Sequence, residues 1–123
     1  MPLKVSVIIP TYNESTVLSE TLTRLKQHQP FEAIIGDGGS DDDTANIARR
    51  HEVTVVQSPR GRAAQMNTAA GEARGDLLLF LHADSYVDSR GYQKMIEIMA
   101  GGPWLGGAFS LQIDSPLPAL KRI

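Results

Sequence analysis

Two side chains that can bind a divalent cation stand two positions apart in this sequence, His82 and Asp84. They follow residues 76–81, the most hydrophobic run of the chain, which predicts a buried strand. Because successive strand residues point to opposite faces, the imidazole and the carboxylate are expected on the same side. A divalent metal accepts both groups, and the oxygens of a bound ligand can complete its shell. The alternative is a capped strand end in which Asp84 bonds to the following turn.

A second candidate, Asp37, lies in the glycine-rich stretch of residues 36–40. An ionised carboxylate only accepts hydrogen bonds, so Asp37 could bind the N–H groups of a nucleobase. The surrounding glycines would let the backbone approach a flat ligand closely. The alternative is an Asp-Gly turn before a helix cap. The aspartates at 41–43 are explained by the favourable interaction of negative charge with a helix N-terminus.

A third candidate is the pair of arginines, Arg60 and Arg62, that flanks Gly61 just before a helix. Two guanidinium groups together with backbone N–H groups would make a seat for a diphosphate. Two solvated loop arginines are the alternative interpretation.

The elements that must position these side chains alternate along the chain. Apolar runs predict strands at residues 5–9 (ended by Pro10), 31–35, 53–56, 76–81 and 108–113. Helical spacing and caps predict helices over about 15–28, from a cap at Ser40 or Asp41 to about 51, within 61–74, and over about 89–100. This order predicts an α/β fold with a mostly parallel sheet and helices on both faces.

In an open α/β sheet, ligands bind outside the carboxyl ends of the strands. Polar, charged and glycine residues follow each of the first four predicted strands, at residues 10–14, 36–40, 60–67 and 82–84. The candidate side chains are therefore expected at one edge of the sheet.

The bulk composition excludes several classes of protein. The 123 residues are 41% hydrophobic and 21% charged, as in an ordinary globular domain, and the net charge of -2 gives no support to a nucleic-acid partner. The chain has no cysteine, which excludes disulfides and thiolate chemistry. No apolar run approaches the ~20 residues of a membrane span. We expect a cytoplasmic protein, with peripheral membrane attachment as the alternative.

The ordered set of motifs resembles glycosyltransferase family 2, in particular a small bacterial subgroup with a His-Ala-Asp motif. The resemblance covers almost the whole chain and rests on the stretches Pro10-Thr11-Tyr12-Asn13-Glu14, Asp37-Gly38-Gly39-Ser40 with Asp42 and Thr44, Gly61-Arg62 with Gln65-Met66-Asn67, and Leu81-His82-Ala83-Asp84.

The resemblance implies a Rossmann-like GT-A fold that binds a nucleoside-diphosphate sugar with Mn²⁺ or Mg²⁺. Asp37 would contact the base, Arg62 would approach the phosphates, and Asp84 would hold the metal together with His82, which stands where the family usually has a carboxylate. The implied nucleotide-binding residues are Pro10, Thr11, Tyr12, Glu14, Asp37, Gly38, Arg62, Gln65 and Asn67.

Most members of the family invert the sugar's configuration and need a general base on the acceptor. No residue here matches that base. We therefore expect residues 1–123 to form a single nucleotide-sugar-binding domain, the N-terminal portion of a longer transferase domain and inactive alone. The acceptor, a lipid or a saccharide, is not indicated, and an exposed sheet edge predicts self-association. The alternative function is a non-catalytic nucleotide-binding or interaction module. A dinucleotide-dependent oxidoreductase is disfavoured because no Gly-x-Gly-x-x-Gly turn follows the first strand.

Overall fold

The computed structural model describes residues 3–102, 106 and 107. The chain divides into two compact units, residues 1–89 and residues 90–123. The expectation of a single domain over residues 1–123 remains a prediction.

A four-stranded parallel sheet forms the centre of the first unit. Its elements, in chain order, are β1 (Val5–Thr11), α1 (Leu18–Lys26), β2 (Glu32–Asp37), α2 (Thr44–Arg50), β3 (Thr54–Gln57), α3 (Arg62–Ala70) and β4 (Leu77–Phe80). The strand order is β3-β2-β1-β4, so the first strand lies between the second and the fourth. The predicted α/β class and the parallel sheet are confirmed.

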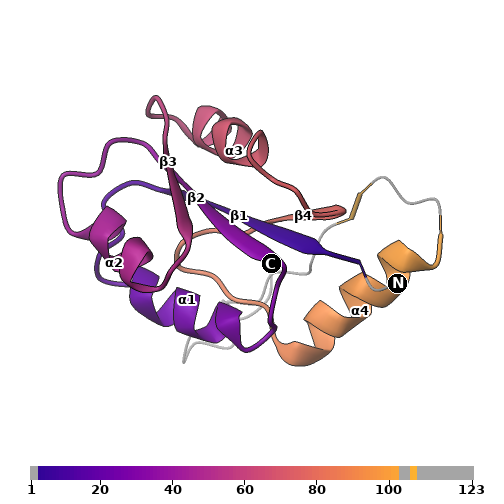
Figure 1. Cartoon of the computed structure of the whole chain (residues 1–123). Helices are drawn as coiled ribbons and strands as arrows, with labels where there is room; N and C mark the ends of the chain where they lie inside the picture. Colours follow the sequence, from indigo (N-terminus) through magenta and orange to yellow (C-terminus); the bar gives the residue numbers. More distant parts are fainter. Residues whose placement is uncertain (1–2, 103–105, 108–123) are drawn as a thin grey trace, which may run out of the picture. The chain divides into compact units, whose positions relative to one another are not determined.

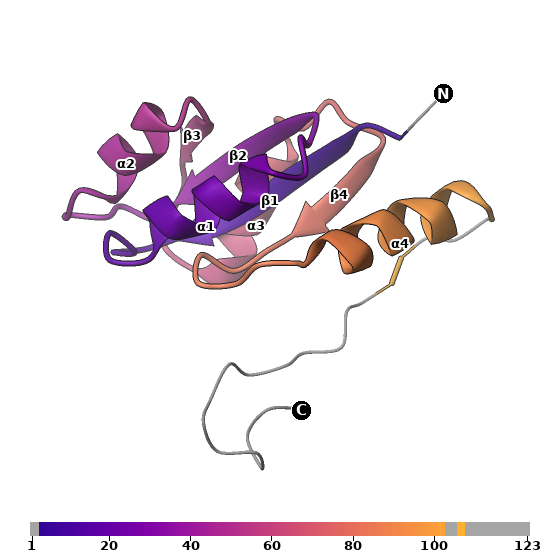
Figure 2. The ribbon, with the colours of Figure 1, turned by 90° about the horizontal axis from the view of Figure 1, so that it is seen from below.

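Helices cover both faces of this sheet, as expected (Figure 1). On one face α3 packs its alanines against β1, β2 and β3, where Ile8, Ile34 and Ala69 form a buried cluster. On the other face lie α1 and α2, and Figure 2 shows α1 in front of the strands and α3 behind them. Val7 and Ile9, which alternate with Ile8, are fully buried. The sheet is thus held rigidly from both sides.

The first strand runs two residues further than predicted, through Pro10 to Thr11. The carbonyl of Ile8 accepts from Leu81 on the β4 side, and the carbonyl of Thr11 accepts from Gly38 on the β2 side. Because backbone groups of successive strand residues point to alternate sides, a backbone N–H at position 10 would point toward β4. The pairing of β1 with β4 ends before this point, at Ile8 and Phe80. The proline therefore removes no ladder hydrogen bond, and the strand continues.

Two helices begin later than predicted. The first begins at Leu18, because residues 14–17 form a turn in which the carbonyl of Glu14 accepts from Val17 and Leu18. The second begins at Thr44, and its cap position is Asp43 rather than Ser40 or Asp41. The side chains of Ser40 and Asp42 and the backbone N–H of Asp41 bond instead to the loop after β1, as described below.

The remaining predictions concern the second unit and the sheet edge. A helix, α4 (Ser89–Ala100), matches the predicted helix at 89–100. The predicted strand at 108–113 lies outside the described residues. At the β4 edge of the described sheet, Leu78 and Phe80 are 41% and 49% exposed. They pair with Ser6 and Ile8 of β1, so their side chains lie on the same face of the sheet as α3. The contacts of α3 on that face are with β1, β2 and β3, which leaves the side chains on β4 exposed.

Candidate functional site

The ends of β1 and β2 are joined by a buried carboxylate. Thr11 and Asp37 are register partners, and Asp37 is only 1% exposed. One of its oxygens accepts from the hydroxyls of Thr11 (2.8 Å) and Ser40 (2.6 Å). The other accepts from the backbone N–H groups of Ser40 (2.9 Å) and Gly39 (3.2 Å).

These four hydrogen bonds decide the charge of Asp37. Burial pushes the pKa of Asp37 upward, but the donors on Ser40, Thr11 and Gly39 together outweigh it and hold the pKa below its ordinary value. The carboxylate is therefore ionised at neutral pH. Its four lone-pair sites are all engaged, so a ligand N–H can bind it only where one of the present donors moves away.

Reciprocal hydrogen bonds join the loop after β1 to the loop after β2. The backbone N–H of Asn13 donates to the Ser40 hydroxyl (2.8 Å), and the N–H of Asp41 donates to the side-chain oxygen of Asn13 (3.0 Å). Asn13 adopts a positive φ of 54°, which asparagine tolerates better than most residues. The expected polar stretches at 10–14 and 36–40 thus lie side by side.

A second set of bonds, around Thr44, closes the same two loops. The N–H of Glu14 donates to the Thr44 hydroxyl (2.9 Å), and the N–H of Ser15 donates to Asp42 (3.2 Å). The Thr44 hydroxyl donates to Asp42 in turn. The hydrogen bonds that Asp42 accepts lower its pKa to about 2, and the bond from the Thr44 side chain contributes most. Asp42 and Thr44 of the motif therefore serve the shape of the loops.

The Gln65 side chain, 5% exposed, lies beneath these loops. Its amide nitrogen donates to the carbonyls of Thr11 (2.6 Å) and Gly36 (3.1 Å), and its amide oxygen accepts from the N–H of Gly61 (3.0 Å). Gln65 was expected to bind nucleotide. Both of its N–H donors are already engaged by backbone groups.

Two arginines stand above the same edge. The guanidinium of Arg60 stacks on the ring of Tyr12, 4.0 Å from its centre, which joins the loop before α3 to the loop after β1. Arg62 begins α3 and is exposed. Within the part of the chain that the structure describes, the Arg62 guanidinium makes no hydrogen bond or ion pair.

The His82-Ala83-Asp84 stretch forms a turn beyond β4. The N–H of Leu81 still bonds to the carbonyl of Ile8 (2.9 Å), and the hydroxyl of Thr21 in α1 donates to the carbonyl of Ala83 (2.6 Å). Leu81 and Ala83 are buried, whereas His82 and Asp84 are exposed, so the expected alternation continues past the strand end. Two potential metal donors are held on the solvent side by their buried neighbours.

The charge of Asp84 acts on Glu14, in the loop after β1. Burial raises the pKa of Glu14, and the negative charges of Asp84 and Asp42 raise it further. The loops after β1, β2 and β4 therefore bring carboxylates within electrostatic reach of one another. Over residues 3–102, 106 and 107, however, no group of three His, Asp or Glu side chains is close enough to hold a metal by itself.

The sequence reasoning also missed residues. It assigned no role to Thr21, gave Thr44 only as part of a motif and expected Ser40 as a helix cap, yet these three hydroxyls fix the loops. A hydroxyl near the end of a strand or the start of a helix is a known signal for such loop bonds. Of the other expected residues, Asn67 is exposed on α3, and Pro10 and Tyr12 are half-buried at the end of β1.

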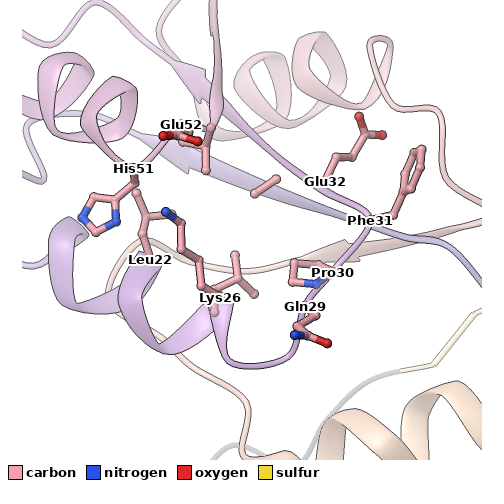
Figure 3. A pocket seen from close by; sticks show the side chains of 11 residues that line it. Leu22, Lys26, Gln29, Pro30, Phe31, Glu32, His51 and Glu52 are labelled. Atoms are coloured by element: carbon pink, nitrogen blue, oxygen red, sulfur yellow. The ribbon is translucent and has the colours of Figure 1, made fainter.

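A pocket of about 280 Å³ lies at the opposite, amino edge of the sheet (Figure 3). It is formed by the end of α1, the start of β2 and the turn before β3, with Lys26, Phe31 and His51 among its lining residues. None of the expected site residues lines it. The pocket lies where the end of α1 meets the start of β2, and it is separate from the candidate site.

No described helix is both long and apolar enough to span a bilayer.

Comparison with known proteins identifies related sequences. The family model for glycosyl transferase family 2 matches residues 6–106. An uncharacterized glycosyltransferase, YfnE, of Bacillus subtilis is 36% identical over 91 residues, covering 67% of this chain and 23% of that protein. A poly(ribitol-phosphate) beta-glucosyltransferase of Bacillus spizizenii is 31% identical over 133 residues, covering 98% of this chain and 20% of the relative. The chain thus spans less than a quarter of the length of these two relatives.

Solved structures share the fold. Residues 1–349 of TarS from S. aureus superpose with a TM-score of 0.72 at 21% identity, covering 90% of this chain and 42% of that one. Glucosyl-3-phosphoglycerate synthase of Mycobacterium tuberculosis, crystallised with Mn²⁺, UDP and glucosyl-3-phosphoglycerate, gives a TM-score of 0.61 at 22% identity over 66% of this chain and 33% of the synthase. The expected GT-A fold is confirmed. With most of its length matched by the family model, the chain belongs to glycosyl transferase family 2.

Proposed function

We propose that this chain binds a nucleoside-diphosphate sugar at the carboxyl edge of its sheet and is the donor-binding part of a sugar transferase. The observation that carries this proposal is the parallel arrangement of β4, β1 and β2, because it brings the turn with Asp84, the loop with Tyr12 and the loop with Asp37 to the same edge of the sheet. Hydrogen bonds join the last two of these loops, and the stacking of Arg60 on Tyr12 adds the loop before α3. Four chain segments of suitable chemistry would therefore serve one ligand.

The base would bind at the ends of β1 and β2. Tyr12 contributes an aromatic ring there, on which Arg60 already stacks. Asp37 is held ionised and could accept a base N–H once the Ser40 hydroxyl turns away. The proposed base site is thus preorganised, with one adjustable donor.

The diphosphate would lie between the start of α3 and the turn after β4. Arg62 presents an exposed guanidinium at the first turn of α3, where backbone N–H groups also favour an anion. Asp84 and His82 face solvent on the other side. Charge of both signs is therefore available along the length expected of a metal-bound diphosphate.

The residues fit a divalent cation that is shared with the ligand. Asp84 and His82 supply two donors, and Mg²⁺ sites commonly use one or two protein carboxylates together with substrate phosphates. The carboxylates of Glu14 and Asp42 add negative charge nearby. When bound, such a cation would neutralise the charge that develops on the departing nucleoside diphosphate. The related synthase crystallised with Mn²⁺ and UDP supports this assignment.

The transfer itself would invert the sugar by direct attack of an acceptor hydroxyl. Such a reaction needs a general base on the acceptor side. The sequence matches no such base, and we expect the 123-residue chain to bind a donor without transferring it. The acceptor, the membrane attachment and the self-association through the sheet edge remain predictions.

Calorimetry with UDP and GDP, each with and without Mn²⁺, tests the proposal. We expect metal-dependent binding of at least one nucleotide, and a loss of about a hundredfold or more in affinity in Asp84→Ala, because the main charged metal donor is removed. The thermal unfolding of that variant should match the wild type, since Asp84 is exposed and accepts only a long hydrogen bond, 3.5 Å, from the Ser85 hydroxyl within the described residues.

The matched control is Asp76→Ala, which removes an exposed aspartate at the opposite edge of the sheet, where it accepts from the N–H of Lys4. Its nucleotide affinity should equal the wild type's. Absence of heat from either nucleotide, with or without metal, would favour a non-catalytic interaction module. Sugar transfer from a labelled donor by this chain alone would contradict the expected inactivity.

A further inference from the structure

The side chain of Gln65 forms hydrogen bonds with three chain segments. Its amide nitrogen donates to carbonyls at the ends of two strands, Thr11 on β1 and Gly36 on β2. Its amide oxygen accepts from the N–H of Gly61, in the loop that leads to Arg62. The carbonyl of Gly61 also accepts from the backbone N–H of Gln65 (2.8 Å), so the two residues bond reciprocally.

Two glycines leave the space that this arrangement needs. A Cβ at Gly38 would lie 2.8 Å from the amide carbon and oxygen of Gln65. A Cβ at Gly36 would lie 2.1 Å from its backbone oxygen. Both contacts are far inside van der Waals distance, so α3 approaches the strand ends as closely as it does only because glycines stand there.

We propose that Gln65 is a positioning residue, which sets the spacing between the base-binding and the diphosphate-binding parts of the nucleotide site. The inference rests on the proposed function. Both N–H donors of the buried amide are used, so Gln65 acts through the segments it joins. On one side it holds the strand ends beside Tyr12 and Asp37, and on the other it holds the loop before Arg62.

The physical reason lies in the loop before α3. Gly61 has a φ of 139°, a conformation that only glycine adopts readily, so the loop has little local preference for its observed shape. The two bonds to Gln65 fix Gly61 against the sheet instead. Without them, Arg62 would sample a wider range of positions, and its contact with a diphosphate would lose the benefit of preorganisation.

A double-mutant cycle between Gln65 and Arg62 tests this inference. UDP affinity in the presence of Mn²⁺ is measured for the wild type, Gln65→Met, Arg62→Ala and the double variant. Each single change should weaken binding roughly tenfold, the factor that corresponds to about 1.4 kcal/mol and to one charge-assisted contact. The double variant should be weaker than Arg62→Ala by clearly less than tenfold, because part of the effect of Gln65 is exerted through the position of Arg62.

A purely structural role predicts a different result. If Gln65 only stabilises the fold, the folded Gln65→Met protein will bind UDP as the wild type does, or the two losses will multiply; either outcome overturns the inference. Gln27→Met makes the same change at an exposed glutamine that follows α1, and its affinity should not change.

Gln65→Met leaves three buried backbone groups without a partner, so folding is checked first by circular dichroism. If the variant does not fold, Gln65→Ala replaces it in the cycle. That variant leaves space for water beside the three backbone groups and also lacks the acceptor for Gly61, so the same non-additivity is expected. A wild-type chain that binds neither UDP nor GDP would overturn the proposed function and this inference together. Wild-type binding without the predicted coupling would overturn the inference alone.

Discussion

The two edges of the sheet use the same device to hold a carboxylate. At the carboxyl edge, Asp37 accepts four hydrogen bonds from Thr11, Ser40 and Gly39. At the amino edge, Glu32 accepts from the Ser6 hydroxyl (2.6 Å) and from the N–H of Arg74 (2.6 Å). Burial raises the pKa of each carboxyl, but the hydrogen bonds outweigh it and leave both pKa values lowered. A satisfied polar network is therefore no mark of function in this protein.

The edges differ in the charges that they leave uncommitted. At the carboxyl edge, Arg62 and Asp84 are exposed, and the charge of Asp84 disfavours ionisation of Glu14 rather than forming a pair. At the amino edge, the exposed Asp76 accepts from the backbone N–H of Lys4. The repulsion between the Asp84 charge and Glu14, beside the exposed Arg62, distinguishes the carboxyl edge from the amino edge.

The largest effect on stability should come from the two networks themselves. Asp37→Asn replaces an acceptor of four bonds by an amide that can accept only at one atom, and we expect a loss of about 2–3 kcal/mol in the free energy of unfolding. Glu32→Gln, in a less buried network, should lose about 1 kcal/mol. Urea denaturation measures both, and only Asp37→Asn should also weaken nucleotide binding. Equal loss of nucleotide binding in the two variants would remove the distinction between the edges.

The acid dependence of stability follows the same contrast. A lowered folded-state pKa gives stability that is present above the unfolded pKa, 3.8 for Asp37, and is lost as the pH falls through the folded value. The wild type should therefore lose stability progressively below about pH 4. Asp37→Asn should show a shallower decline, which denaturation at a series of pH values would detect.

An intermediate effect is expected for the exposed arginines. Arg62→Ala should weaken UDP binding roughly tenfold while thermal stability stays the same, because its guanidinium would contact only the ligand. Arg74→Ala, at the amino edge, should leave UDP affinity unchanged, since only its backbone N–H takes part in the network. A salt titration sharpens the comparison, because the contribution of Arg62 should decrease as ionic strength rises. Equal affinities for Arg62→Ala and the wild type would remove Arg62 from the proposed site.

Features that depend on neighbouring residues in the sequence could be predicted, and features that depend on contacts between distant residues could not. The order of strands and helices along the chain and the alternation of His82 and Asp84 are local patterns, and they predicted the class of the fold and the placement of both side chains on the same side of the strand. The length of β1 could not be read locally, since Pro10 is tolerated only because β4 ends beside it. The late start of α2 has the same origin: Asp42 and Ser40 bond to the loop after β1, 25 or more residues away in the sequence.

The site residues show the same limit. Arg62 and Asp84 were predicted from their types and their places after strands, which suffices for side chains that point to solvent. Gln65 was predicted from a motif, but its three partners come from the ends of two strands and from the loop before α3. Which polar residues serve the backbone and which remain available to a ligand is decided by tertiary contacts.

The smallest effect, and the most direct measure of how the carboxyl edge differs, is the titration of Glu14. Its pKa is raised first by burial and then by the charges of Asp84 and Asp42. Asp84→Asn should therefore move the pKa of Glu14 down toward its ordinary value without reaching it, because the burial remains. Asp76→Asn should not move it. Carboxyl resonances followed by NMR through the acid range measure both shifts, and Mn²⁺ is left out because it would broaden them.

Added Mg²⁺ should lower the pKa of Glu14 in the wild type, since a cation at Asp84 offsets the repulsion, and should do so much less in Asp84→Asn. If the pKa of Glu14 responds neither to the substitution nor to the cation, the expected effect of Asp84 on Glu14 is wrong, and the placement of a cation at Asp84 loses its support.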